Sequence, residues 1–140
     1  MTITLRHETP QDIATIESVT ASAFLNAEHT DHNEHLIVNA LRDAGALTLS
    51  LVALDDQHLG APHIVGHASI SPVTISGGES GWYGLAPVSV LPDFQGKGIG
   101  SALVKQILVE LKSIGAAGCV VLGDPAFYSR FGFVADDSLV

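Results

Sequence analysis

The length and composition of the chain predict one compact domain over residues 1–140. Hydrophobic residues make up 46% of the 140 residues and charged residues 15%, and the mean hydropathy is +0.35. Such a composition excludes a disordered or solvating chain. A chain of this length buries an adequate core without disulfides or structural metal ions.

The net charge of −9 excludes the basic footprint that nucleic-acid binding requires. Residues 1–94 carry the whole of this charge, whereas residues 95–140 balance to zero. An anionic ligand is therefore expected to bind the C-terminal third of the chain, and a cationic amine the acidic remainder.

Cysteine usage predicts a reducing, cytoplasmic setting. The only cysteine, Cys119, cannot form an internal disulfide, and no signal-peptide pattern opens the sequence. The apolar runs are much shorter than a bilayer span, which argues against a membrane partner. Cys119 lies in the apolar run Gly-Cys-Val-Val-Leu without a cationic neighbour, so we expect it to pack rather than react.

The first 46 residues predict a short strand and two helices. Residues 3–7 alternate as a strand does, and Thr9-Pro-Gln-Asp12 opens a helix to about Phe24. The second helix is predicted from apolar residues at helical spacing: Leu36, Ile37, Ala40 and Leu41. Gly45 is placed to end that helix in a left-handed conformation.

The remaining pattern predicts a sheet crossed by one long helix. Residues 47–54, 63–73 and 82–90 are short apolar or alternating runs separated by turn residues, which indicates an antiparallel meander. Residues 95–115 form a glycine-opened helix with apolar positions four apart: Ile99, Leu103, Ile107 and Leu111. A strand at 118–122, a short helix at 124–132 and a strand beginning at 133 complete a mixed sheet covered by helices.

The run from Gln95 to Gly100 carries the chemical signal. Three glycines in five residues are unfavourable at a helix start, each by up to ~1 kcal/mol relative to alanine. Without Cβ atoms, the turn can direct several N–H groups into one concavity at the positive end of the helix, which suits a phosphate or pyrophosphate. P-loop spacing is absent, and the dinucleotide fingerprint fails because Ser101 stands where its third glycine is needed.

This loop belongs to a larger pattern. Q-x-x-G-x-G follows the strand end V-x-V-L-P and precedes F-Y-S-R-F-G-F at 127–133, which resembles the GNAT superfamily of acetyl-CoA-dependent N-acyltransferases, most closely over residues 85–133. The resemblance implies a three-layer α-β-α fold with a mixed, mostly antiparallel sheet. It also implies acetyl transfer from acetyl-CoA to a primary amine of a small molecule or peptide by direct attack. The alternative is a non-catalytic acyl-CoA-binding or sensor domain on the same fold.

The resemblance assigns roles to individual residues. It places the pyrophosphate of coenzyme A on Gln95, Gly96, Lys97, Gly98, Ile99, Gly100 and Ser101. The pantetheine arm would pair with the backbone of Val88, Ser89 and Val90. Tyr128 would protonate the leaving thiolate, a role that suits a phenol; the alternative is a core tyrosine beside Phe127, Phe131 and Phe133.

The general base remains open at the level of sequence. The strand at 82–90 holds no carboxylate, so the candidates are His67, Glu79, a chain of water, or the polar cluster at 28–35: Glu28, His29, Asp31, His32, Glu34 and His35. His29, His32 and His35 have spacing that could hold a metal, but an acid-rich exposed stretch is the better interpretation, and no metal is expected.

The end of the chain predicts an unpaired strand edge. Only seven residues follow Phe133, too few for a full hairpin, so the fold is expected to be short at the C-terminus. An open edge favours pairing with a second copy, which predicts either a homodimer or marginal stability.

Overall fold

A five-stranded mixed sheet forms the centre of the computed structural model, which describes residues 3–24, 34–55, 63–73 and 81–121. The strands follow one another in space as they do in sequence: β1 (Ile3–His7), β2 (Leu49–Asp55), β3 (His63–Pro72), β4 (Trp82–Val90) and β5 (Gly118–Val121). The first four pair antiparallel, and β5 pairs parallel to β4. The predicted meander and the mixed sheet are confirmed.

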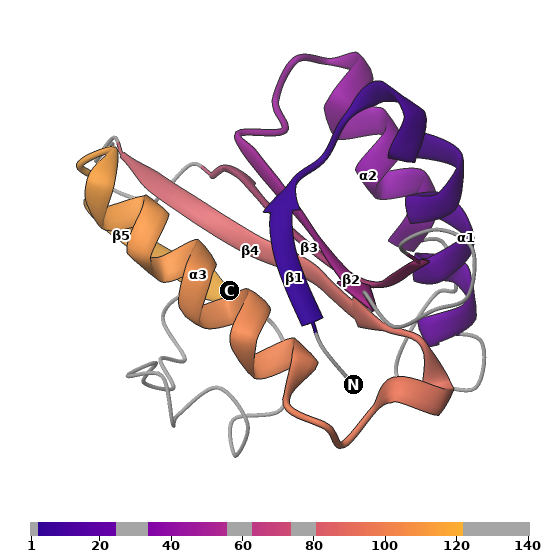
Figure 1. Cartoon of the computed structure of the whole chain (residues 1–140). Coiled ribbons are helices and arrows are strands. Elements are labelled where there is room, and N and C mark those ends of the chain that lie inside the picture. The colour runs from indigo at the N-terminus through magenta and orange to yellow at the C-terminus, as the bar shows by residue number, and fades with distance from the viewer. Residues whose placement is uncertain (1–2, 25–33, 56–62, 74–80, 122–140) are drawn as a thin grey trace.

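Helices cover both faces of this sheet (Figure 1). They are η1 (Pro10–Asp12), α1 (Ile13–Phe24), α2 (Glu34–Asp43), η2 (Pro92–Phe94) and α3 (Ile99–Ser113). In Figure 1, α1 and α2 lie together on one side and α3 crosses the other, which confirms the three-layer arrangement. No helix in the described ranges is long and apolar enough to span a membrane. The predicted short helix, the last strand and its open edge fall in 122–140, outside the described residues.

The face under α3 holds the larger core. The four predicted apolar positions of α3, Ile99, Leu103, Ile107 and Leu111, are all buried there against β2, β3 and β4. Gly66 on β3 permits close packing at the start of the helix, because a Cβ at this position would lie 3.2 Å from the side chains of Ile99 and Leu103. The N-terminal end of α3 is thereby fixed against the middle of the sheet.

On the opposite face of the sheet, two of the apolar residues that predicted α2 face solvent and not the sheet. Helical spacing is confirmed, but Leu36 and Ile37 are 55% and 48% exposed, whereas Val38 is buried. The physical reason is a polar contact on the face of α2 that packs against the rest of the domain. Arg42 lies there and donates to Glu8, with Nη2 2.8 Å from Oε1. A partly buried ion pair at that interface accounts for a helix rotation that apolar spacing alone would set differently.

The start of the first helix is held by Asp12, as its sequence position predicts. The Asp12 carboxylate accepts hydrogen bonds from the Thr9 backbone N–H at 2.7 Å and from Arg6 Nη1 at 2.7 Å. The hydrogen bond from Arg6 is the main cause that lowers the pKa of Asp12 to about 2. Asp12 is almost fully buried, so this carboxylate ties β1 to α1.

Replacing Asp12 by Asn should lower the free energy of unfolding by about 1–3 kcal/mol at pH 7, since a charge-assisted hydrogen bond is lost. A depressed pKa means that the carboxylate stabilises the fold above about pH 4 and that this stabilisation is lost as the pH falls toward 2. Urea unfolding at pH 7 and pH 2.5 tests both statements. Asp43→Asn, at an exposed position of α2, is the control. An equal loss at both pH values would contradict the assignment.

Candidate active site

The loop between η2 and α3 has the backbone that its glycines predict. Gly96 and Gly98 adopt positive φ angles of 77° and 84°, a region that other residues enter only with strain. Gln95 anchors the loop to β4, because its Nε2 donates to the carbonyl of Val90 at 3.0 Å. A Cβ at Gly96 or Gly98 would meet nothing within 4 Å. Glycine is therefore needed at these positions for the backbone conformation and not for space.

This conformation leaves a row of amides available. Ala102 N–H is the first of α3 to find an intrahelical partner, the carbonyl of Gly98 at 3.0 Å. In the described part of the chain, the N–H groups of residues 96–101 have no hydrogen-bond partner. They lie at the positive end of a 15-residue helix. Together they form a site for an anion such as a pyrophosphate.

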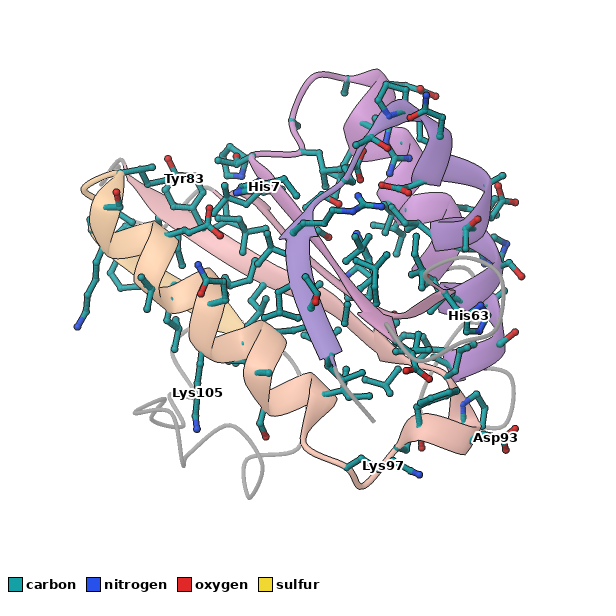
Figure 2. All side chains as sticks on the ribbon, viewed as in Figure 1. His7, His63, Tyr83, Asp93, Lys97 and Lys105 are labelled. Atoms are coloured by element: carbon teal, nitrogen blue, oxygen red, sulfur yellow. The ribbon has the colours of Figure 1, made fainter. Side chains whose placement is uncertain are left out.

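A lysine adds positive charge to the same loop. Lys97 is exposed, with its Nζ 6.0 Å from the centre of the Phe94 ring. Figure 2 shows Lys97 projecting from the turn before α3, and Lys105 further along that helix. Lys97 thus adds positive charge beside the free amides, whereas Lys112 lies in the last turn of α3 and Arg130 lies outside the described residues.

Strand β4 changes its pairing in the middle. Toward β3, Ser69 alone lies opposite Ala86 and Pro87, since Ala68 pairs with Val88 and Ile70 with Leu85. This β-bulge lies in the part of β4 that contains Gly84 and Pro87, residue types that favour irregular strands. Toward β5, the described pairing ends at Leu85 with Val121. Beyond the bulge, β4 is therefore paired on one side only within the described residues.

The unpaired side of β4 exposes specific backbone groups. Leu91 N–H donates to the carbonyl of Val65 on β3 at 2.9 Å, so alternate residues of β4 turn their amides to β3 and the others turn them away. By this alternation Ser89 faces β3 with its backbone, whereas Val88 and Val90 face the open side. The hydrogen bond from Gln95 to the Val90 carbonyl agrees with this direction. An extended ligand with amide groups can pair with such an edge.

The other face of the same strands carries a polar network that sequence reasoning missed. His67 is completely buried on β3, and its Nε2 lies 2.7 Å from Ser50 Oγ on β2. Ser50 Oγ also bonds to Glu8 Oε1, and Glu8 is held by Arg42 with N–O distances of 2.8 and 3.0 Å. The sequence does contain a pattern that could have predicted this network. Polar residues stand at alternate positions in otherwise apolar strands, and alternate residues of a strand lie on one face of the sheet.

Burial controls the charge state of this network. Desolvation lowers the pKa of His67 to about 4, although the charge of Glu8 acts in the opposite direction. Burial alone would raise the pKa of Glu8, but the hydrogen bonds from Arg42 and Ser50 outweigh it and hold the pKa below its usual value. At neutral pH the network therefore contains a neutral imidazole and a carboxylate.

Several other candidate residues are not placed. Tyr128, Glu79 and residues 28–33 lie outside the described residues; Glu34 begins α2, and His35 is half-buried on it. Cys119 lies on β5, where burial raises the pKa of its thiol to about 11, consistent with a packing role. No group of three metal-binding side chains occurs in the described ranges.

Known proteins share this architecture. The model of the acetyltransferase (GNAT) domain matches residues 47–135. The uncharacterized N-acetyltransferase YhbS of Escherichia coli K12 is 39% identical over 129 residues, which cover 92% of this chain and 72% of YhbS.

Solved structures agree with this match. A GNAT family acetyltransferase from Brucella melitensis in complex with acetyl-CoA is 51% identical, with a TM-score of 0.89 over 96% of this chain and 84% of that one. YhbS from Escherichia coli in complex with CoA is 36% identical in the aligned structure, with a TM-score of 0.80 over 94% of this chain and 68% of that one.

The buried imidazole should make stability depend on pH. As the pH falls from 6.5 toward 4, the unfolded chain binds a proton that the folded chain excludes, so the free energy of unfolding should fall by up to about 3 kcal/mol. Denaturant titrations at pH 7 and 4.5 measure this slope. His67→Gln should flatten it, whereas His63→Gln on the same strand should not. A His67→Gln variant with the wild-type slope would show that another group is responsible.

Proposed function

The chain belongs to the GNAT acetyltransferase family, and from that premise we propose that it transfers the acetyl group of acetyl-CoA to a primary amine of a small molecule or peptide. The observation that carries the proposal is the row of unpartnered amides at residues 96–101, with Lys97 beside it and the unpaired side of β4 next to it. The acetyl-CoA and CoA complexes of the two similar structures support this choice of cosubstrate.

Each part of coenzyme A finds a fitting surface. The pyrophosphate would accept hydrogen bonds from the loop amides between Gln95 and Ser101 and gain from the positive end of α3. The pantetheine amides would pair with the segment Val88–Val90, whose outward N–H and C=O groups repeat with strand spacing. The thioester would then lie near the β-bulge at residues 86–87.

The reaction is direct aminolysis of the thioester. The amine nitrogen forms a bond to the acetyl carbon, the carbon–sulfur bond breaks, the amine loses a proton, and the thiolate gains one. Tyr128, in the segment matched by the family model, is the proposed donor to the thiolate.

The charge distribution favours a cationic acceptor. The net charge of −9 falls entirely before residue 95, in the part that contributes α1, α2 and the first strands. Coenzyme A, itself anionic, would meet the neutral C-terminal third. Such a division attracts an amine-bearing cation to one part of the protein and leaves the other to the phosphates.

Gly98→Val should weaken acetyl-CoA binding tenfold or more in calorimetry, because a side chain at φ 84° displaces the loop amides from the pyrophosphate. Gly45→Val is a matched control, since Gly45 is also exposed, has φ 68° and has open space around a Cβ. The control carries the same backbone strain away from the loop and should keep wild-type affinity. Equal affinities in the two folded variants would refute the assignment.

Tyr128→Phe should keep the affinity for acetyl-CoA and lose about 10²-fold or more in kcat, the usual size of a general-acid contribution. The measurement is coenzyme A release with an amine panel at saturating acetyl-CoA. Unchanged turnover would return Tyr128 to a packing role.

The same assay separates the enzyme from an acyl-CoA sensor on this fold. A sensor would bind acetyl-CoA in calorimetry but release no coenzyme A with any amine. Failure to bind acetyl-CoA at all would contradict both functions and favour an interaction module.

A further inference from the structure

The polar network behind β3 forms a continuous chain from the sheet interior to the surface. It begins at His67, passes through Ser50 and reaches Glu8, which lies with Arg42 in a surface pocket of about 260 Å³. His67 and Ser50 are buried, whereas the side chains of Glu8 and Arg42 are 18% and 17% exposed. None of these four residues belongs to the surface proposed for acetyl-CoA.

The hydrogen bonds determine which imidazole nitrogen carries the proton. The Glu8 carboxylate can only accept, so the single hydroxyl proton of Ser50 is directed to Glu8. Ser50 Oγ must therefore act as acceptor toward His67, and Nε2 of His67 must carry the N–H. Nδ1 is left as a bare lone pair, and it is completely buried without a hydrogen-bond partner.

His67 lies on β3 opposite the segment of β4 that is proposed to pair with pantetheine. His67 is the cross-strand partner of Ser89, the residue next to Val88 on β4, so both side chains are on the face covered by α1. Ser89 Oγ is likewise buried without a partner, as is Thr20 Oγ1 on α1. Buried polar atoms are normally hydrogen-bonded, and unpaired ones at the interface of α1 with β3 and β4 point to a bound polar group or water.

We propose that Nδ1 of His67 accepts the proton of the attacking amine, through one water molecule held beside Ser89, and that Ser50 and Glu8 position the imidazole for this step. The proposal rests on the proposed function. As the nitrogen–carbon bond forms, the amine proton passes to Nδ1 and an imidazolium results. The carbon–sulfur bond then breaks with protonation of the thiolate by Tyr128. When the product leaves, His67 returns its proton to water and the Tyr128 phenolate takes a proton from water.

Charge and burial suit this role. The groups whose charge acts on His67 are Glu8, after β1, and Arg42, on α2. The cross-strand neighbours Val52 and Ser89 are uncharged, as are the buried residues of α1: Ile16, Val19 and Thr20. Burial lowers the pKa of His67 to about 4, which keeps the imidazole neutral with a free lone pair at physiological pH but also makes it a weak base. The charge of Glu8 acts against this effect and favours the protonated ring. The Glu8 carboxylate stabilises the imidazolium through Ser50, as a carboxylate does in a catalytic triad.

The first experiment reads the tautomer without any reaction. Long-range ¹H–¹⁵N NMR of the full chain at pH 7, with the His67 signals identified from their loss in His67→Gln, should show a protonated Nε2 and an unprotonated Nδ1. Ser50→Ala should mix the two tautomers, and Ser50→Thr, which keeps the hydroxyl, should restore the first. A protonated Nδ1 in the wild type would overturn the proposal whatever the activity.

The second experiment measures kcat/KM for an accepted amine between pH 6 and 10. His67→Gln should lower it about 10²-fold or more at pH 7, and the loss should shrink at high pH where hydroxide removes the proton. A merely structural role would give the same loss at every pH. Ser50→Ala should lose about tenfold, with Ser50→Thr near wild type. His7→Gln is the matched histidine control, since exposed His7 pairs with Glu110 outside the chain of hydrogen bonds.

The outcomes separate the two proposals. Coenzyme A affinity by calorimetry should be unchanged in all these variants. An active wild type with a His67→Gln variant within threefold of it would overturn the role of His67 and leave the acetyltransferase intact. A wild type that binds acetyl-CoA but acetylates no amine would overturn the proposed function, and the role of His67 with it.

Discussion

The extra residue in β4 is the constraint on which the arrangement of the site depends. Ser69 faces two residues, Ala86 and Pro87, where a regular ladder would place one. The described pairing with β5 stops at Leu85, just before this point. A regular β4 between two full-length neighbours would use all its backbone groups internally and offer none to a ligand. The bulge lies directly after the last described pair with β5, so within the described residues β4 is paired on one side only from this point on.

The same bulge separates two chemical environments by strand alternation. Beyond it, Val88 and Val90 turn their side chains to the apolar core under α3 and their backbone groups to the open side. Ser89 turns its side chain to the opposite face, toward α1 and His67. One strand segment thus offers backbone groups on its open side, where we propose that the cosubstrate pairs, and a polar side chain on the face covered by α1. The period of two in a β-strand is sufficient to produce this division.

Local patterns were enough to predict most of the fold, because each predicted element agrees with its own end signals. Thr9 to Asp12 and Gly45 mark helix ends where the sequence places them, and the four buried residues of α3 follow helical spacing. The predicted helix over 95–115 begins only at Ile99, because Gly96 and Gly98 adopt positive φ angles. The rotation of α2 could not be predicted in this way. It depends on Arg42 pairing with Glu8, and these residues are 34 positions apart in the chain.

The candidate site likewise has one part that local sequence patterns predict and one part that they do not. The loop proposed to bind the pyrophosphate is contiguous, and its conformation follows from glycine and a helix start, so spacing alone predicts it. The His67 network draws one residue each from β2, β3, α2 and the segment after β1, and no local pattern links them. Histidine was a candidate base from its place on the central strand, but its tautomer depends on which partner takes the proton of Ser50. That information exists only once the strands are paired.

The Glu8–Arg42 pair explains why such a network can persist in an otherwise apolar core. A half-buried ion pair gains little net stability, because desolvation offsets most of its attraction. Without Glu8, Ser50 would lose the acceptor of its hydroxyl proton, and the direction of the hydrogen bond between Ser50 and His67 would no longer be fixed. Arg42 keeps the carboxylate charged, the carboxylate directs the proton of Ser50, and Ser50 fixes the imidazole. A partly buried cation is therefore linked through Glu8 and Ser50 to the proton position of a buried ring, and each bond of this chain depends on the next.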